Sequence, residues 1–507
     1  MEKLELEEEI SGGIFFQYVN SIALFLAGFI FYIYIIHFYS SQLVGTVALL
    51  LAITSLLNIF FSLGLGYGLQ HFISYHLGRK EYSSIRGMTV KFSAIGVGLA
   101  SLSFIFLYFS SPIFAILFFH SFKYIILVKF LGIDLFFMLI STFLSGILIG
   151  LQNFKSQAAW GVVGIVTTYV LPVILLLYFN RAIFMVVGWA SGYALSSIAY
   201  SILIFKRVGK IATNGKNVNV SPVLRYAFPI FLASLIGYGA SYVDRFIVSY
   251  LMNLSLLGIY NFALLISSAI SFLVVPFPTI LLPKLSEMYG LGKKEEIKEY
   301  VAKGMELMST VYVPVAMLIA ALSSYILPFL SSVEYLPVSG PMMIVLVSSS
   351  VFVTGNILSV SLQGIRKTKI FIITSLFALL SNFVISVLLI PKFQMIGASI
   401  GYSSIYAVSF FIMYYYARKF DVLKFEGIKI AKIYLSGFVM FFVILTLQDK
   451  FPYSPLKLFI LIFLGFAIYA GMIKVMKTFA KEDIDFIMLL IPWWLQRIKI
   501  VISVLFL

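Results

Sequence analysis

Long apolar stretches recur along the whole chain of 507 residues, and they constrain the fold more than any other feature. A helix of about 20 apolar residues crosses the roughly 30 Å hydrocarbon core of a bilayer. Only 11% of the residues are charged, against about a quarter in a soluble protein. The sequence therefore predicts an all-α polytopic membrane protein.

Hydropathy predicts about fourteen transmembrane helices. Residues 68–91 and 284–306 form polar connectors between them. The stretch 486–507 carries a proline, two tryptophans and two basic residues in its middle, which favours a helix lying in the membrane interface. The predicted spans are 14–37, 41–67, 91–115, 124–150, 157–179, 182–205, 226–250, 254–282, 308–330, 337–362, 370–391, 394–417, 430–447 and 457–475.

The basic residues predict the orientation. If the N-terminus is cytoplasmic, the loops on that side and the C-terminal tail carry 29 of the 36 lysines and arginines, and the outer loops carry six. Cytoplasmic loops of membrane proteins are enriched in Lys and Arg, so both termini are expected in the cytoplasm, at a cell membrane. The net charge of +16 is thereby explained by topology and lipid headgroups, and no nucleic acid is expected as a partner.

An internal repeat is visible at an offset of 209–214 residues. "VGTVALL" at 44 corresponds to "LGIYNFA" at 257, and "YHLGRKEY" at 75 corresponds to "YGLGKKEE" at 289. A repeat of six spans places both halves in the same orientation, which is typical of transporters with the substrate path between the halves. We expect an N-terminal lobe at 1–208, a C-terminal lobe at 209–425, and two extra spans with the interfacial tail at 426–507.

Catalytic signatures are missing, so no enzyme activity is expected. "GLGKK" at 290–294 lacks the spacing of a phosphate-binding loop, and no H-E-x-x-H motif occurs. The chain has no cysteine, and its four histidines are scattered, so no cofactor or firm metal site is predicted. The glycines of "GLGYG" at 64–68 and the prolines of "PFPTILLP" at 276–283 interrupt helices at matching places of the repeat. These interruptions are compatible with helix bending during alternating access or with simple loop entry.

The adjacent pair Asp244 and Arg245 lies inside the seventh predicted span. Charged groups at such depth usually face a bundle interior or a watery cavity. Consecutive residues of a helix point about 100° apart, so the two side chains are not expected to face each other closely. The alternative is that Arg245 extends toward the interface while Asp244 pairs with a neighbour.

Further polar residues inside spans are candidates for a cavity or an ion site. Asp134 in the fourth span is either functional or an interfacial acid near two lysines. The stripe formed by Gln17, Tyr18 and Asn20 could line a cavity. The eleventh and twelfth spans contain the polar residues Asn382, Ser386, Ser403 and Ser404. Their side chains could form hydrogen bonds between helices, or they could supply oxygen ligands for a cation.

Three stretches carry a family resemblance. "SYVDRFIVSYLMNLSLLGIYNFALLI", "LLPKLSEMYGLGKKEEI" and "LLIPKFQMIGASIGYSSIY" resemble the oligosaccharide flippases, or polysaccharide biosynthesis proteins. Their superfamily, the multidrug/oligosaccharidyl-lipid/polysaccharide flippases, also holds lipid II flippases and multidrug and toxin extrusion proteins. The resemblance covers essentially the whole chain, and its motifs are diffuse.

The resemblance implies two six-helix lobes around a cavity that opens alternately to either side. The substrate would be a polyprenyl-(pyro)phosphate-linked oligosaccharide moved from the cytoplasmic to the outer leaflet. Arg245, followed by Arg225, is the candidate for its phosphate. Glycosyltransferases of the same pathway are expected as partners, and the protein is expected to be a monomer.

For coupling, the resemblance to lipid II flippases implies a sodium site. Asp244 and Asn382 match two of its ligands, Ser386 stands near the place of a second acid, and Ser403 or Ser404 offers a hydroxyl. The missing second acid counts against Na⁺ coupling, and coupling to H⁺, to the membrane potential or to nothing are the alternatives. The alternative functions are a cation-coupled multidrug exporter of the same superfamily and a membrane glycosyltransferase or polymerase.

Overall fold

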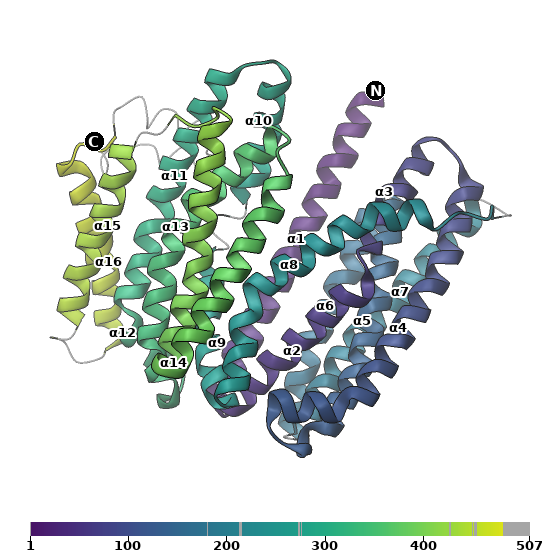
Figure 1. Ribbon diagram of the computed structural model, residues 1–507, viewed down its shortest axis with the longest axis horizontal. Coiled ribbons are helices and arrows are strands. Elements are labelled where there is room, and N and C mark those ends of the chain that lie inside the picture. Colours follow the sequence, from purple (N-terminus) through teal and green to yellow (C-terminus); the bar gives the residue numbers. More distant parts are fainter. Residues whose placement is uncertain are drawn as a thin grey trace. The chain divides into compact units, whose positions relative to one another are not determined.

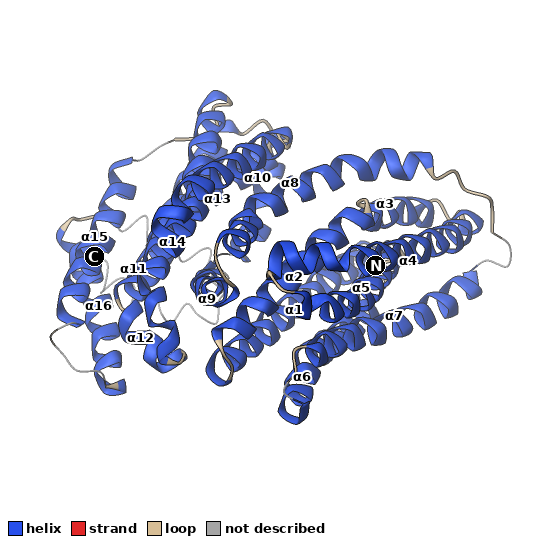
Figure 2. Ribbon diagram, turned by 60° about the horizontal axis from the view of Figure 1, so that its bottom comes forward, coloured by secondary structure: helices blue, strands red, loops and turns tan. Residues whose placement is uncertain are grey.

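A computed structural model describes residues 2–479, apart from 180, 212–214, 272–273, 275, 425–426, 449 and 451–453. In these ranges the secondary structure is helical and contains no strand (Figure 2). The predicted interfacial tail at 486–507 lies outside the described residues. The chain divides into two compact units: unit 1 comprises Met1–Tyr238 and Asn253–Ser255, and unit 2 comprises Gly239–Met252 and Leu256–Leu507.

The helices confirm the predicted fold class. Among the described residues, thirteen helices are long and apolar enough to cross a membrane. One of them, α14 (Lys369–Lys419), contains the eleventh and twelfth predicted spans, which Gln394 separates with φ 51° and ψ −127°. The thirteen helices therefore correspond to the fourteen predicted spans. Helix is the expected structure because hydrocarbon offers backbone N–H and C=O groups no partner outside the segment itself.

Unit 1 is built around α5 (Ile125–Gly150), which makes a smaller contact with α6 (Phe154–Phe179) and packs most extensively against four other helices of the unit. These four are α2 (Ser41–Ser62), α3 (Leu65–Gly78), α4 (Tyr82–Phe119) and α7 (Ile183–Ile211). The other helices are α1 (Glu2–Phe38), which packs against α6 (Phe154–Phe179), and the first part of α8 (Ser221–Leu251). The labels are shown in Figure 1.

The crossing of α3 and α5 depends on small residues. A Cβ atom on Gly146 would lie 2.7 Å from the carbonyl oxygen of Gly66, so a side chain there would force the two backbones apart. Gly146 belongs to a small-xxx-small spacing with Gly150, a pattern that lets membrane helices approach closely. This close crossing holds α3 in place beside the centre of the unit.

Unit 2 contains the second part of α8 and the later helices. Within it, α11 packs against α13 and α15, α13 packs against α14, and α15 packs against α16 (Figure 1). The bounds are α9 (Leu254–Ser271), α10 (Pro276–Gly290), α11 (Lys294–Ala321), α12 (Ser323–Leu330), η3 (Val333–Val338), α13 (Ser339–Gly364), α15 (Gly427–Gln448) and α16 (Pro455–Val475).

The order of helices repeats along the chain as the sequence repeat predicts. In the first half, α2 ends at Ser62 and the shorter α3 follows, and in the second half α9 ends at Ser271 and the shorter α10 follows. The first interruption is local: Leu63 and Gly64 both adopt positive φ, 50° and 68°. Glycine reaches such a conformation without the steric cost of a Cβ atom, which explains its place at the break.

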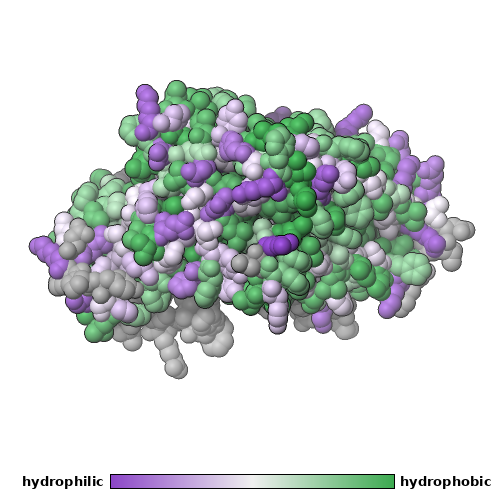
Figure 3. Space-filling view, turned by 90° about the horizontal axis from the view of Figure 1, so that it is seen from below, coloured by the Kyte–Doolittle hydropathy of each residue, from purple (hydrophilic) through white to green (hydrophobic). Residues whose placement is uncertain are grey.

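Apolar side chains remain exposed on outer helix faces, as a lipid environment requires. Phe109 of α4 is 76% exposed and Phe205 of α7 is 81% exposed. Hydrophobic side chains also cover much of the face drawn in Figure 3, with hydrophilic ones between them. Exposed apolar surface of this extent is typical of a membrane contact.

Candidate functional site

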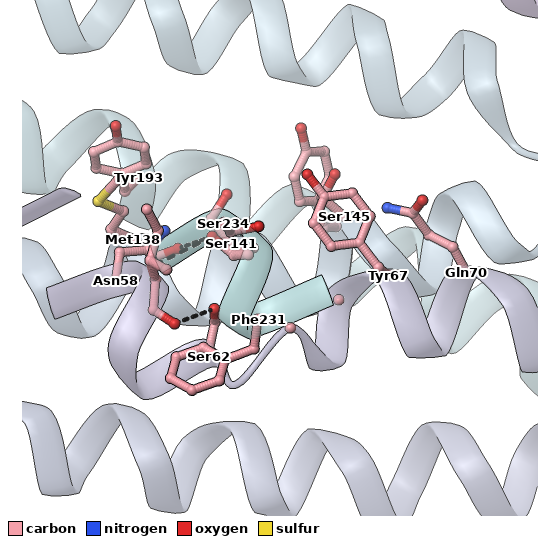
Figure 4. A pocket seen from close by; sticks show the side chains of 15 residues that line it. Asn58, Ser62, Tyr67, Gln70, Met138, Ser141, Ser145, Tyr193, Phe231 and Ser234 are labelled. Atoms are coloured by element: carbon pink, nitrogen blue, oxygen red, sulfur yellow. Dashed lines mark hydrogen bonds between the residues drawn. The ribbon is translucent and has the colours of Figure 1, made fainter. Parts of the chain in front are cut away.

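Unit 1 contains a partly open pocket of about 440 Å³, which we call the unit 1 pocket (Figure 4). Residues of α2, α3, α5, α7 and the first part of α8 line it, together with Gly64 at the helix break. Most of its side chains carry a hydroxyl or a carboxamide group. These are Asn58, Ser62, Tyr67, Gln70, Ser141, Thr142, Ser145, Tyr193, Tyr200 and Ser234.

The break between α2 and α3 shapes this pocket. Asn58 and Ser62 precede the break and Tyr67 and Gln70 follow it, so one short stretch of chain supplies two helices to the wall. The break lies against the first part of α8: a Cβ on Gly64 would be only 2.7 Å from the carbonyl oxygen of Ala227. The same part of α8 contributes Phe231 and Ser234 to the lining.

Some of the polar groups are already engaged by the protein. The hydroxyl of Thr142 donates to the carbonyl of Met138 at 2.8 Å. The amide of Gln157 donates to the hydroxyl of Ser145 at 3.1 Å, and the hydroxyl of Tyr200 donates to the carbonyl of Gln157 at 3.1 Å. These bonds fix one wall of the pocket, because they connect α5, α6 and α7.

Other polar groups of the lining have no hydrogen-bond partner within the described part of the chain. They are the amide of Gln70 and the hydroxyls of Tyr67, Ser141, Tyr193 and Ser234. A polar group away from water costs free energy unless it is hydrogen-bonded. The free groups can therefore bind water or the hydroxyl groups of a ligand.

A second polar site lies in unit 2 and consists of Asp244, Tyr260, Asn382 and Ser386; we call it the Asp244 cluster. The hydroxyl of Tyr260 donates to Oδ2 of Asp244 at 2.5 Å, and the amide of Asn382 donates to Oδ1 at 3.3 Å. Ser386 donates to the amide oxygen of Asn382 at 2.9 Å. The four side chains are fully buried, and they connect α8, α9 and α14.

Arg245 has partners other than Asp244. Its Nε donates to Asn261 at 3.2 Å, its Nη1 donates to the carbonyl of Ser241 at 2.6 Å, and its guanidinium lies 4.1 Å from the ring centre of Tyr242. The side chains of Asp244 and Arg245 therefore bond to different residues, as the rotation of about 100° between consecutive helix residues predicts. Nη2 of Arg245 has no partner among the described residues.

The remaining predicted residues lie at separate places. Asn20 of α1 is near the unit 1 pocket: its Oδ1 has no partner, and both this atom and the hydroxyl of Tyr200 lie against Gly161. Gln17 and Tyr18 belong to the same helix, and their side chains lie outside the described part.

Asp134 is buried in α5, 1% exposed, and its Oδ1 has no hydrogen-bond partner in the described part of the chain. Arg225 lies near the start of α8 and lines an open pocket of about 410 Å³ with Asn219, Ser221, Pro222 and Tyr226. Ser403 accepts a hydrogen bond from Ser348 at 2.7 Å, apart from the Asp244 cluster, and Ser404 donates to Ser381 at 3.1 Å. The described residues contain no group of three His, Cys, Asp or Glu that could hold a metal ion.

The sequence prediction missed most of the unit 1 pocket. Two signals were available: Asn58 is an amide inside the second predicted span, and Gln70 follows the glycine-rich break. Hydroxyl residues gave no such signal, because Ser and Thr occur widely in membrane helices, where they bond the backbone of the preceding turn.

The helical units and their polar interior define a polytopic membrane protein with a transporter fold. The chain belongs to the polysaccharide biosynthesis protein family, whose model matches residues 12–289, more than half of the chain. The MatE family model matches residues 229–388. The superfamily predicted from the sequence is thereby confirmed.

Known proteins that are similar to this chain include two archaeal relatives and a solved flippase structure. An uncharacterized membrane protein of Methanocaldococcus jannaschii is 26% identical, over 68% of this chain and 70% of the relative. The "Probable low-salt glycan biosynthesis flippase Agl15" of Haloferax volcanii is 21% identical, over 60% of this chain and 66% of the relative. The solved structure of the lipid II flippase MurJ in an inward closed conformation has a TM-score of 0.74 at 18% identity, over 91% of this chain and 98% of that one.

Proposed function

We propose that this protein is a flippase that moves a polyprenyl-(pyro)phosphate-linked oligosaccharide from the cytoplasmic to the outer leaflet by alternating access. The observation that carries the proposal is the unit 1 pocket, which places ten hydroxyl- or amide-bearing side chains inside a membrane-spanning unit. Membership of the polysaccharide biosynthesis protein family supports it, as does the similarity to a protein described as a glycan biosynthesis flippase.

The chemistry of the pocket suits sugar. A sugar ring presents hydroxyl groups that both donate and accept, and the free groups of Gln70, Tyr67 and Ser141 can do the same. Tyr193 and Phe231 add aromatic surface for the apolar face of a ring. Binding sites for small molecules commonly combine such apolar surface with a few convergent polar groups.

The phosphate of the lipid carrier requires a cation, and two arginines are proposed for it. Arg245 has one terminal nitrogen without a partner among the residues that the structure describes. Arg225 lines an open pocket near the start of α8. Guanidinium groups bind phosphate oxygens through charge-assisted hydrogen bonds. On α1, Gln17, Tyr18 and Asn20 are proposed to meet the sugar, with Asn20 next to Gly161.

For coupling, we assign a proton rather than Na⁺ to the Asp244 cluster. Tyr260 and Asn382 already donate to the two carboxylate oxygens, and Ser386 adds a hydroxyl rather than a second carboxylate. Sodium prefers several oxygen ligands, whereas a proton needs one acceptor atom. Asp134 belongs to unit 1 and Ser403 is hydrogen-bonded to Ser348, so neither is assigned to the cluster.

The proposal includes the organisation expected from the sequence: lobes at 1–208 and 209–425, extra spans at 426–507, and both termini in the cytoplasm. The protein would act as a monomer in the cell membrane, with glycosyltransferases of the same pathway supplying its substrate. It would transport without chemical conversion and without a cofactor.

A cation-coupled multidrug exporter is the second candidate, because the MatE family model matches residues 229–388. A buried organic cation is compensated best by a carboxylate, and the described residues that line the unit 1 pocket include none. This difference favours the flippase.

Reconstitution in liposomes tests the proposal. A fluorescent polyprenyl diphosphate-linked oligosaccharide is placed in both leaflets, and its accessibility to an external quencher is followed. We expect leaflet exchange faster than in protein-free vesicles. Exchange equal to that of protein-free vesicles, together with export of a cationic dye, would overturn the flippase assignment in favour of the exporter.

A further inference from the structure

The unit 1 pocket has a second property beyond its polarity, which is the absence of charge in its lining. None of the fifteen described residues that line it is Asp, Glu, Lys, Arg or His. Its polar groups are hydroxyls and carboxamides, which are neutral at any physiological pH. The pocket thus offers many hydrogen bonds and no countercharge.

From this lining we infer that the unit 1 pocket selects an uncharged sugar unit and disfavours sugars that carry a carboxylate, sulfate or phosphate. This inference rests on the proposed function and specifies its substrate class. The phosphate of the lipid carrier is assigned to the arginines outside the pocket.

The first argument is desolvation. An ionised group that leaves water for a membrane-spanning interior loses hydration, and only a countercharge or several strong donors can compensate. The pocket offers neutral donors from Gln70, Tyr67 and Ser141 but no cation. A neutral hydroxyl loses far less hydration and is matched by the same groups. The free-energy difference favours the uncharged ring.

The second argument concerns Asp134, which lies one turn of α5 before the pocket lining. Asp134 precedes the lining residue Met138 by four positions, so the two lie on the same face of the helix, one turn apart. Asp134 is buried, and its Oδ1 has no hydrogen-bond partner. Protonated, it gives no positive charge; ionised, it repels an anion. In neither state does it supply a positive charge to an acidic sugar.

The third argument is that the pocket is held in shape by its own walls. Ser145, Tyr200 and Gln157 form hydrogen bonds that connect α5, α6 and α7. Gly146 and Gly66 fix α3 against α5. A preorganised neutral site cannot readily bring in a distant lysine or arginine to meet an anion, so selectivity follows from the lining itself.

The test compares two fluorescent polyprenyl diphosphate-linked oligosaccharides of equal length. One contains neutral hexoses only, and in the other a uronic acid replaces one hexose. Binding is measured in detergent and leaflet exchange in proteoliposomes. We expect the neutral compound to bind, and to exchange, at least about tenfold better than the acidic one.

Gln70→Arg places a cation in the lining and is expected to shift this ratio toward the acidic compound by about tenfold. Gln363→Arg on the exposed end of α13 adds the same charge outside the pocket and should leave the ratio unchanged. Thermal unfolding of each variant in detergent verifies that it is folded.

The outcomes separate the two proposals. Equal binding of both compounds to the wild type, or a ratio unchanged in folded Gln70→Arg, would overturn the selection of neutral sugars. Selective binding without any leaflet exchange would support the selection and overturn the flippase function. Binding of neither compound would overturn both.

Discussion

The hydroxyl of Tyr260 on α9 donates a 2.5 Å hydrogen bond to Oδ2 of Asp244 on α8. The amide of Asn382 on α14 donates to the other carboxylate oxygen. Three helices of unit 2 thus meet at one buried acid. Because polar groups in a membrane interior need partners, this arrangement joins the helices as well as holding the acid.

The variant Tyr260→Phe should therefore destabilise the protein. It removes one hydrogen bond to a buried carboxyl and leaves the ring in place, so we expect a loss of roughly 1 kcal/mol in the free energy of unfolding. Tyr250→Phe is the matched control, because Tyr250 of α8 is 55% exposed. Thermal unfolding in detergent compares the two, and equal midpoints would contradict a stabilising role for the Tyr260 hydroxyl.

Leaflet exchange should respond to a proton gradient and not to a sodium gradient. Both carboxylate oxygens of Asp244 already accept hydrogen bonds, and Ser386 supplies no second carboxylate. Replacing Na⁺ by choline on both sides of proteoliposomes should leave the rate unchanged, whereas an imposed pH difference should alter it. A rate that falls on removal of Na⁺ would assign the cluster to sodium instead.

Arg245→Ala should slow leaflet exchange more than Lys450→Ala. Arg245 is buried and retains one free terminal nitrogen, whereas Lys450 is an exposed residue of a predicted outer loop. We expect a loss of about tenfold or more for Arg245→Ala, the usual range for a charge-assisted contact to phosphate. Equal rates at equal amounts of reconstituted protein would remove Arg245 from the phosphate site.

Gly146→Ala should destabilise unit 1, while Gly98→Ala should not. A Cβ at 146 would come within 2.7 Å of the Gly66 carbonyl, and a Cβ at 98 meets no atom within 4 Å. Alanine also favours helix over glycine by up to about 1 kcal/mol, so Gly98→Ala should be neutral or stabilising. Unfolding midpoints in detergent check both, and a stable Gly146→Ala would contradict the close crossing of α3 and α5.

The sequence predicted the fold well because membrane spans are a property of local composition. The runs at 41–67 and 124–150 need no partner to be identified as spans, and the repeat then predicts the order of helices. Asp244, Asn382 and Ser386 were also predicted together, through the family resemblance.

The unit 1 pocket could not be predicted in the same way. Its walls come from residues as distant as Asn58 and Ser234, and only the packing of α2, α3, α5, α7 and α8 brings them together. Hydroxyl side chains in membrane helices usually bond their own backbone, as Thr142 does. The local sequence therefore does not show which of these hydroxyl residues also line a pocket.

The most direct measurement of the central claim is the initial rate of leaflet exchange of a neutral polyprenyl diphosphate-linked oligosaccharide in proteoliposomes. The comparison uses the wild type, the double variant Asn58→Leu/Gln70→Leu and the exposed control Gln363→Leu, at matched incorporation. We predict exchange above that of protein-free vesicles for the wild type and the control, and a loss of about tenfold or more for the double variant. A wild-type rate equal to that of protein-free vesicles, or a double variant as fast as the wild type, would contradict the account.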